Sequence, residues 1–244
     1  MLGSWRSVAL PAAALLLWEL GAGLRLVDLE FISRPSQILI AAIAGLADGS
    51  LLHATWQTLE ACVFGLAIAL VTGVGAGIFL GLSPFAELVS RPSLEGLRSI
   101  PSIAFAPLTL LLFGFGLPME GTIIAYACLW PILITTISAA RNIEPRLIEI
   151  AAVLEMSPLA RVRKIVIPAM LPRVLVGVRT AAGFALVVSV TVEILINPRG
   201  LGYGLIIAQQ SLRIDLMYAY LLWLAVIGLT VNALVRLADR EVVA

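Results

Sequence analysis

The chain has 244 residues, of which 61% are hydrophobic and 13% are charged, and its formal net charge is +1. Average globular chains are about 45–50% apolar and about 25% charged, so a soluble domain of this length could not bury so much apolar surface. The near-neutral charge argues against a nucleic-acid partner. Cys62 and Cys128 both lie in apolar runs, which indicates no disulfide or metal framework. The composition is that of an integral membrane protein.

Six stretches approach the 20 apolar residues that a helix needs to cross a bilayer. They lie at approximately 8–26, 56–82, 101–117, 121–140, 174–196 and 215–236. Residues 1–23 also have some features of a signal peptide, but Glu19 interrupts the apolar run and no convincing cleavage site follows. We therefore expect an all-α integral membrane protein with one domain, 1–244, and about six transmembrane helices.

Basic residues set the expected orientation, because cytoplasmic loops of membrane proteins are enriched in lysine and arginine. With the amino terminus inside, twelve of the sixteen basic residues fall on the cytoplasmic side. The twelve are Arg6, Arg91, Arg98, Arg141, Arg146, Arg161, Arg163, Lys164, Arg173, Arg179, Arg236 and Arg240, and the outer four are Arg25, Arg34, Arg199 and Arg213. This distribution predicts that both termini and the segment 141–173 face the cytoplasm.

The segment 144–168 is a polar island between apolar stretches. It cannot cross the bilayer, because a charged side chain at the centre costs about 2.5–3.5 kcal/mol. Its apolar residues Leu147, Ile150, Ala151 and Leu154 nevertheless keep helical spacing. Such an amphipathic helix lies either on anionic membrane lipid or in a groove of a partner protein, and the pattern alone leaves both open.

Prolines divide the island into two expected helices. Pro145 suits the first position of one helix, and Ser157-Pro158 provides a capping side chain and a first residue for the other. We expect Pro168 and Pro172 to end the second helix and to start the next span.

The order of residues in the island resembles the cytoplasmic loop of the permease subunits of bacterial ATP-binding-cassette importers. That loop reads Glu-Ala-Ala, three residues, Gly, nine residues, Ile, one residue, Leu-Pro. The spacing here agrees at every position, with Glu149, Ile150, Ala151, Glu155, Ile165, Ile167 and Pro168. Glu155 replaces the glycine, which would end the first helix in a left-handed conformation. Because glutamate adopts that conformation poorly, we expect Ser157-Pro158 to provide the break instead.

The resemblance extends over about residues 33–240. It is closest to the branch that imports nitrate, aliphatic sulfonates, taurine, bicarbonate and some vitamin precursors. The matching segments are Arg34-Pro35-Ser36-Gln37, Arg98-Ser99-Ile100-Pro101, Ala106-Pro107-Leu108, Phe113-Gly114-Phe115-Gly116, Glu193 and Gly200-Leu201-Gly202-Tyr203.

The resemblance implies a type I importer permease in the bacterial cytoplasmic (inner) membrane. Such a subunit is not an enzyme and needs no cofactor, because a pair of cytoplasmic ATPase subunits uses ATP and Mg. The ATPase would bind the loop, and the coupling residues would be Glu149, Ile150, Ala151, Glu155, Ser157, Ile165 and Pro168. A periplasmic or lipoprotein substrate-binding protein would dock on 27–53 and 197–214, two copies of the chain would pair, and the solute would be a small anion such as a sulfonate, taurine or nitrate.

Two other function classes stay open on the sequence. A self-contained secondary transporter or channel would need no ATPase and would show inverted repeats and broken helices at mid-membrane. A membrane scaffold would transport nothing. Within the importer family, a vitamin precursor is the alternative substrate.

Three acidic residues, Glu19, Glu60 and Glu193, lie inside the expected spans. Acidic residues in spans are functional candidates, but a bare carboxylate would repel an anion in transit. A structural partner, such as Arg199 or a backbone amide, explains them as well. Glu193 has the better claim on the translocation path, and Ser189 and Thr191 would add hydroxyls there.

One apolar span also carries small residues at regular intervals. Gly73, Gly77 and Gly81 recur every four residues, which predicts close packing of helices in lipid. The pattern does not say whether this packing occurs within one copy or between two.

Overall fold

The computed structural model describes residues 4–23 and 32–243, and every regular element within these ranges is a helix. The elements are α1 (Ser4–Gly23), α2 (Pro35–Ala47), α3 (Ser50–Leu82), α4 (Pro84–Arg98), the 3-10 helix η1 (Ser102–Phe105), α5 (Ala106–Phe113), α6 (Leu117–Arg141), α7 (Pro145–Val153), α8 (Pro158–Arg161), the π-helix η2 (Val162–Val166), α9 (Ile167–Leu195), α10 (Gly200–Gln210) and α11 (Ile214–Val243). The expected all-helical fold is confirmed.

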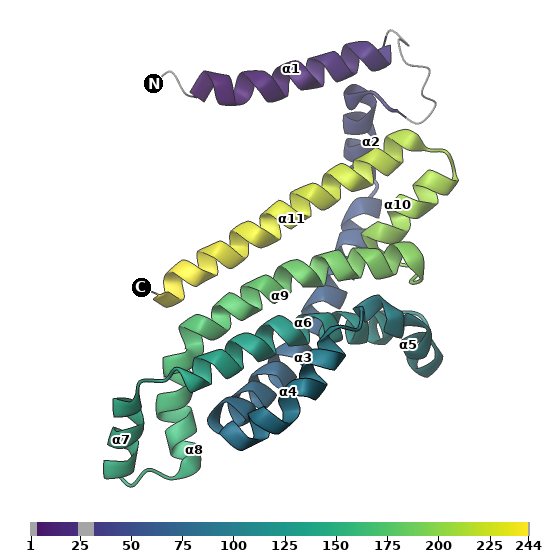
Figure 1. Ribbon diagram of the computed structural model, residues 1–244. Helices are drawn as coiled ribbons and strands as arrows, with labels where there is room; N and C mark the ends of the chain where they lie inside the picture. Colours follow the sequence, from purple (N-terminus) through teal and green to yellow (C-terminus); the bar gives the residue numbers. More distant parts are fainter. Residues whose placement is uncertain (1–3, 24–31, 244) are drawn as a thin grey trace.

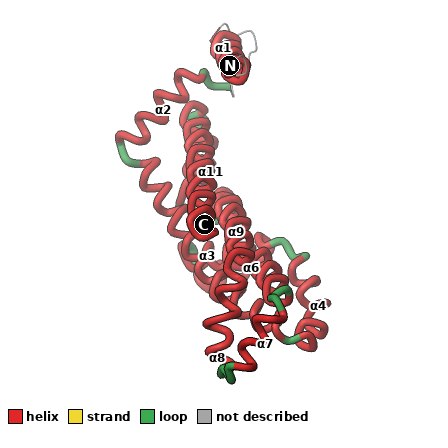
Figure 2. The backbone as a smooth tube through the Cα atoms, turned by 90° about the vertical axis from the view of Figure 1, so that its left-hand side faces the viewer, coloured by secondary structure: helices red, strands yellow, loops and turns green. Residues whose placement is uncertain are grey.

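The long helices form a bundle with a distinct group of short helices at each end (Figure 1). In the bundle, α6 packs between α3 and α9, and α11 packs on α9. Figure 1 shows α2 and α10 at one end, and Figures 1 and 2 agree that α7 and α8 project together from the other.

Four helical runs in the described residues are long and apolar enough to cross a membrane. They are Ser50–Leu82, Leu117–Arg141, Pro158–Gln210 and Ile214–Leu237. A bent pair, Pro84–Arg98 with Ser102–Phe113, would be a fifth. The first expected span, 8–26, coincides with α1, but the apolar stretch found there, Ala13–Ala22, is shorter than a crossing, and residues 24–26 lie outside the described residues.

The third crossing differs from the expected span 101–117, because the structure begins it at α4 and bends it by 82° before η1. Pro101 explains the bend, since a proline disfavours helical backbone at the residue before it. On α4, Glu87 and Arg91 turn toward α6, whereas Phe85 and Leu88 are exposed on the opposite side. The apolar side of α4 therefore faces outward, as suits a helix between protein and lipid.

Small residues bring α3 and α6 into close contact along most of their length. A Cβ atom built on Gly73 would lie 2.9 Å from Ile132 Cγ2, and one on Gly77 would lie 2.5 Å from Thr136 Cβ. The predicted packing role of the glycine row is thus confirmed, and the row serves contacts within one copy.

Substituting Gly77 with alanine should destabilise the bundle, because the new methyl group would overlap Thr136 and push α3 from α6. We expect Gly77→Ala to cost about 1–3 kcal/mol, as overpacked cores do. The measurement is the thermal unfolding midpoint of the detergent-purified protein. Gly75→Ala is the matched control, since a Cβ there meets nothing within 4 Å. Equal midpoints for the two variants would contradict the close approach.

Candidate functional site

The polar island folds into a helical hairpin at one end of the bundle, with α7 leading to α8, η2 and α9 (Figure 1). Ala151 is 1% exposed, while Ile150, Val153 and Leu154 on the same helix are 50%, 82% and 65% exposed. Leu159 on α8 is also exposed. Ala151 thus anchors the hairpin from inside, whereas four other apolar residues of the island form an uncovered patch, which we call the loop patch (Ile150, Val153, Leu154 and Leu159).

Glu155 ends α7 in the left-handed conformation, with φ +47°. Its amide donates to the Ala152 carbonyl, and the Met156 amide donates to the Ala151 carbonyl, each at 3.0 Å. This pair of bonds is a Schellman motif. The expectation that Ser157-Pro158 would replace Glu155 at the break is therefore wrong, because glutamate takes the strained position and the two bonds offset its cost.

Ser157 instead begins the next helix, since its hydroxyl accepts from the Ala160 amide at 3.3 Å. Pro168 does not end that helix. It lies in the first turn of α9, and Pro172 lies inside α9. Both prolines lack an amide donor, so a regular α-helix would leave carbonyl groups of the preceding turn unpaired. The π-helical turn that contains Ile165 precedes them, and its shifted hydrogen bonds keep the helix continuous. Glu149 is exposed and borders a cavity of about 490 Å³ beside Arg161.

At the opposite end, Glu193 joins three helices through buried hydrogen bonds. It is 1% exposed, and its carboxylate accepts from the Thr58 hydroxyl of α3 and the Gly202 amide of α10, each at 2.7 Å. The Thr58 hydroxyl also accepts from the Leu201 amide at 3.0 Å. The carboxylate therefore caps the start of α10 and fixes α3 and α10 to α9.

A second buried carboxylate, Glu120 of α6, extends this network, which we call the outer network because it lies at the end of the bundle opposite the hairpin. It accepts from the Ser189 hydroxyl and from the Asn197 amide, the latter at 2.6 Å. The Asn197 carbonyl in turn accepts from the Gly116 amide at 3.0 Å. Sequence reasoning missed Glu120 and Asn197. The signal was available for Glu120, because it is an acidic residue at the start of a long apolar run.

The candidate pathway residues thus lie in two different places. Ser189 is fully buried in the outer network with Glu193, whereas Thr191 lies on another side of α9 and borders a cavity of about 630 Å³. The Thr191 hydroxyl donates to the Val187 carbonyl of its own helix. The geometry supports a structural role for Glu193 and Ser189, and only Thr191 faces a cavity.

The other acidic residues of the expected spans also have partners. Glu60 pairs with Arg199 at 3.0 Å, which confirms the interpretation that Arg199 is a structural partner. Glu19 accepts from both the amide and the hydroxyl of Ser36, at 3.0 Å and 2.8 Å.

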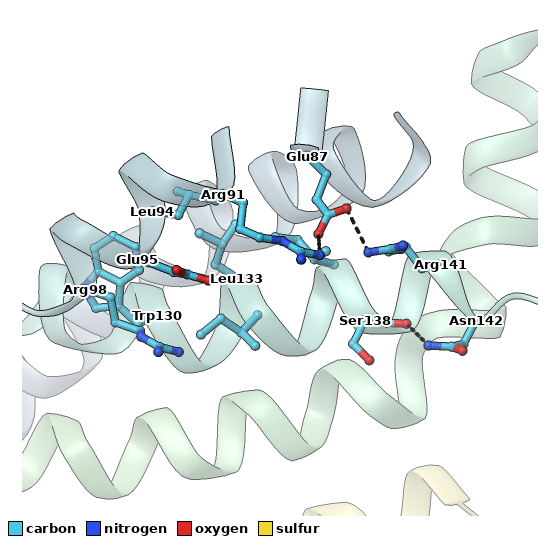
Figure 3. A pocket seen from close by; sticks show the side chains of 12 residues that line it. Glu87, Arg91, Leu94, Glu95, Arg98, Trp130, Leu133, Ser138, Arg141 and Asn142 are labelled. Atoms are coloured by element: carbon cyan, nitrogen blue, oxygen red, sulfur yellow. Dashed lines mark hydrogen bonds and ion pairs between the residues drawn. The ribbon is translucent and has the colours of Figure 1, made fainter. Parts of the chain in front are cut away.

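A cavity of about 550 Å³ lies between α4 and the inner half of α6 (Figure 3). Glu87 bridges two arginines there, with one carboxylate oxygen 2.7 Å from Arg91 and the other 2.8 Å from Arg141. Arg98 projects into the cavity beside Trp130, away from this bridge (Figure 3). The bridge ties α4 to the end of α6 from which the hairpin departs.

Comparison with known proteins identifies the family of this chain. The family model for the binding-protein-dependent transport system inner membrane component matches residues 73–243. The chain belongs to this family. It is a permease, the membrane subunit of a binding-protein-dependent ABC importer.

Relatives of the permease match over nearly its whole length. A permease assigned to aliphatic sulfonate transport in Bacillus subtilis (strain 168), SsuC, is 29% identical over 98% of this chain and 87% of its own. The riboflavin transport system permease protein RibX of Chloroflexus aurantiacus is 32% identical over 98% and 90%. The taurine transport system permease protein TauC of Escherichia coli (strain K12) is 27% identical over 96% and 87%.

A solved structure has the same fold. The permease aligns with a chain of the inward-facing MetNI methionine ABC transporter at a TM-score of 0.65 and 21% identity, covering 77% of this chain and 93% of that one. This likeness confirms the type I importer fold.

Glu155→Gly should stabilise the hairpin of the permease, because glycine adopts a left-handed conformation without the strain of about 1 kcal/mol that other residues carry. Glu149→Gly should do the opposite by about 1 kcal/mol, because it places glycine inside α7. Hydrogen exchange of the amides between residues 150 and 157 measures both effects. Faster exchange in Glu155→Gly would contradict the assigned backbone.

Glu193→Leu should lower the free energy of unfolding of the permease by about 1–3 kcal/mol, because it leaves the buried Gly202 amide without an acceptor. Glu193→Gln should lose less, since its carbonyl can accept from Gly202 and the hydroxyls around it can rotate. Denaturation in detergent provides the measurement, with Thr191→Val as the control at a half-buried position outside this network. A Gln variant as unstable as the Leu variant would contradict a clamp built from hydrogen bonds.

Proposed function

We propose that this permease imports a small organic or inorganic anion and is driven by a pair of cytoplasmic ATPase subunits that bind the α7–α8 hairpin. The loop patch is the observation that carries the proposal. Four apolar side chains lie uncovered on a hairpin that projects from the bundle, and a partner protein is what such a patch fits. ATP and Mg belong to the ATPase in this scheme, and the permease itself catalyses no reaction.

The residues expected to contact the ATPase now divide into three groups. Glu149, Ile150 and Glu155 are exposed and available to a partner, and Ser157 and Pro168 shape the backbone. Ala151 is covered within the chain, so it supports the hairpin from inside. Glu155, in place of the family glycine, projects a charge that a basic residue of its own ATPase would match.

The anion is inferred from the relatives. Several are named for the transport of aliphatic sulfonates, taurine, nitrate or bicarbonate, and these solutes share a compact oxyanion group. A riboflavin-type solute is the second candidate, because RibX matches 98% of this chain at 32% identity. Affinities of the cognate binding protein for taurine, ethanesulfonate, nitrate and riboflavin would decide between the two candidates.

The assembly would contain two copies of this permease, since one hairpin engages one ATPase subunit and a two-fold arrangement forms one central path. The broad apolar side of α9, including Phe184 and Val187, is exposed and could be covered by the second copy. A periplasmic or lipoprotein binding protein would dock at the end of the bundle that carries α2 and α10. The first residues of the expected docking segment, 27–31, lie outside the described residues.

The hairpin end would face the bacterial cytoplasm. In Figure 1, α11 runs from the α10 end back toward the hairpin side, which supports a cytoplasmic carboxyl terminus. Met1 and Ala244 themselves lie outside the described residues. Arg98 ends α4 beside the middle of α6, so it no longer belongs with the cytoplasmic residues that support this orientation.

Val153→Asp should release the ATPase without disturbing the fold, because Val153 is 82% exposed on the loop patch. The variant loses the burial of one valine at the interface and buries an aspartate charge there instead. Together these effects should weaken the complex by roughly 2 kcal/mol or more. Co-purification of the ATPase with tagged permease measures this. Leu212→Asp is the matched control, since Leu212 is 72% exposed at the opposite end of the bundle. Full ATPase recovery with Val153→Asp would overturn the proposed docking site.

A further inference from the structure

Arg98 stands at the bend of the broken span, where α4 ends. The Leu97 carbonyl accepts from the Tyr126 hydroxyl at 2.5 Å, which fixes this end of α4 to α6. Tyr126 and Trp130 lie near the middle of α6, a helix that crosses the membrane. The arginine is therefore held at mid-depth and not on the cytoplasmic side, where the distribution of basic residues predicted it.

Two cavities meet at this arginine. The cavity of about 550 Å³ extends from Arg98 to Asn142, at the hairpin end of α6. The cavity of about 630 Å³ extends from Arg98 to Ser102 and Thr191, on the other side of the bend. Arg98, Trp130 and Ile134 line both cavities, so they form the boundary between an inner and an outer space.

The charges around Arg98 leave it as the surplus cation. Arg91 and Arg141 both bind Glu87, and Glu95 is the only other acidic residue that lines the inner cavity. Arg98 forms no ion pair with any of the described residues. Beside it, the buried Trp130 Nε1–H has no hydrogen-bond acceptor in the described part of the chain. Among the described residues, an unpaired guanidinium and a buried indole N–H thus lie in one wall.

An arginine at this depth is costly unless it pairs or faces water, and such residues mark solute pathways. The planar guanidinium fork matches the oxygens of a carboxylate, sulfonate or nitrate group. We infer that Arg98 binds the anionic group of the solute at the boundary between the two cavities. This inference rests on the proposed import of an anion and assigns the mid-membrane contact for it.

The experiment uses the whole transporter, with its ATPase and binding protein, in nanodiscs of zwitterionic lipid. Iodide is the anionic probe and acrylamide the neutral one. The chain has five tryptophans, so the Trp130 fluorescence is isolated by subtracting the emission of Trp130→Phe from that of the parent at each quencher concentration. Arg98→Gln removes the charge, Arg98→Lys keeps it, and Arg163→Gln removes an equal charge from the exposed hairpin.

Iodide should quench Trp130 roughly tenfold less in Arg98→Gln than in the parent, the low end of the enrichment that a charged cleft produces. Arg98→Lys and Arg163→Gln should retain most of the iodide quenching, and acrylamide quenching should be equal in all variants. Ethanesulfonate or bicarbonate should protect Trp130 from iodide in the parent and not in Arg98→Gln.

Equal iodide quenching in Arg98→Gln and the parent would overturn the inference, as would protection by neither oxyanion. A fall in acrylamide quenching, or loss of the second copy from Arg98→Gln complexes, would also overturn it, by showing that Arg98 is a structural contact. ATP hydrolysis stimulated by the binding protein is measured on the same samples. If stimulation is absent from the parent, the proposed function fails. If stimulation is present and iodide quenching is equal in the parent and Arg98→Gln, only this inference fails.

Discussion

The close approach of α3 and α6 is the contact on which the rest of the structure depends. In lipid, no hydrophobic force draws apolar helices together, so their association relies on contact between surfaces. Small residues on α3 provide that contact from Gly65, against Ile124, to Gly81, against Ala140. Because α6 is held along this length, both of its ends are fixed. One end places Glu120 in the outer network, and the other places Arg141 where the hairpin begins.

The broken span shows how an irregular backbone is accommodated at membrane depth. Non-helical segments are tolerated there when they are buried in protein or line a cavity. The bend between α4 and η1 meets the second condition, because Arg98, Ile100 and Pro101 border cavities. Beside it, the Phe105 and Tyr126 rings pack η1 against α6 with their centroids 4.6 Å apart. The polar side of α4 can then face α6 without contacting hydrocarbon.

The sequence was sufficient to predict what depends on composition and local spacing. The long crossings, the hairpin and the glycine row follow from apolar length, from the Glu149-to-Pro168 order and from a four-residue period. The cost of a lone charge in lipid indicated that the acids of the spans could have structural partners, with Arg199 as one candidate, but it did not say that Glu60 is the acid that pairs with Arg199.

The predictions that were wrong or missing concerned contacts that form only in the folded chain. The polar residues of α4 suggested a cytoplasmic loop, although Glu87, Arg91 and Glu95 recur every four residues and so could have indicated a helix with one polar side. The partners of Glu193 come from α3 and α10, and no local pattern reveals them. Glu155 was misjudged because propensity argues against its conformation, while the two hydrogen bonds that hold it exist only in the folded turn.

The π-helical turn has a mechanical consequence. It joins α8 to α9 without an interruption of the helical backbone, although the direction of the chain changes between them (Figure 1). The α9 helix is about 43 Å long at 1.5 Å per residue, and near its middle the Cys128 thiol of α6 donates to the Ala181 carbonyl at 3.2 Å. One covalent helical path therefore connects the hairpin to the Glu193 end of the bundle. A force applied to α8 would reach the α3 and α10 segments that Glu193 holds through this path, with no flexible loop between them to absorb it.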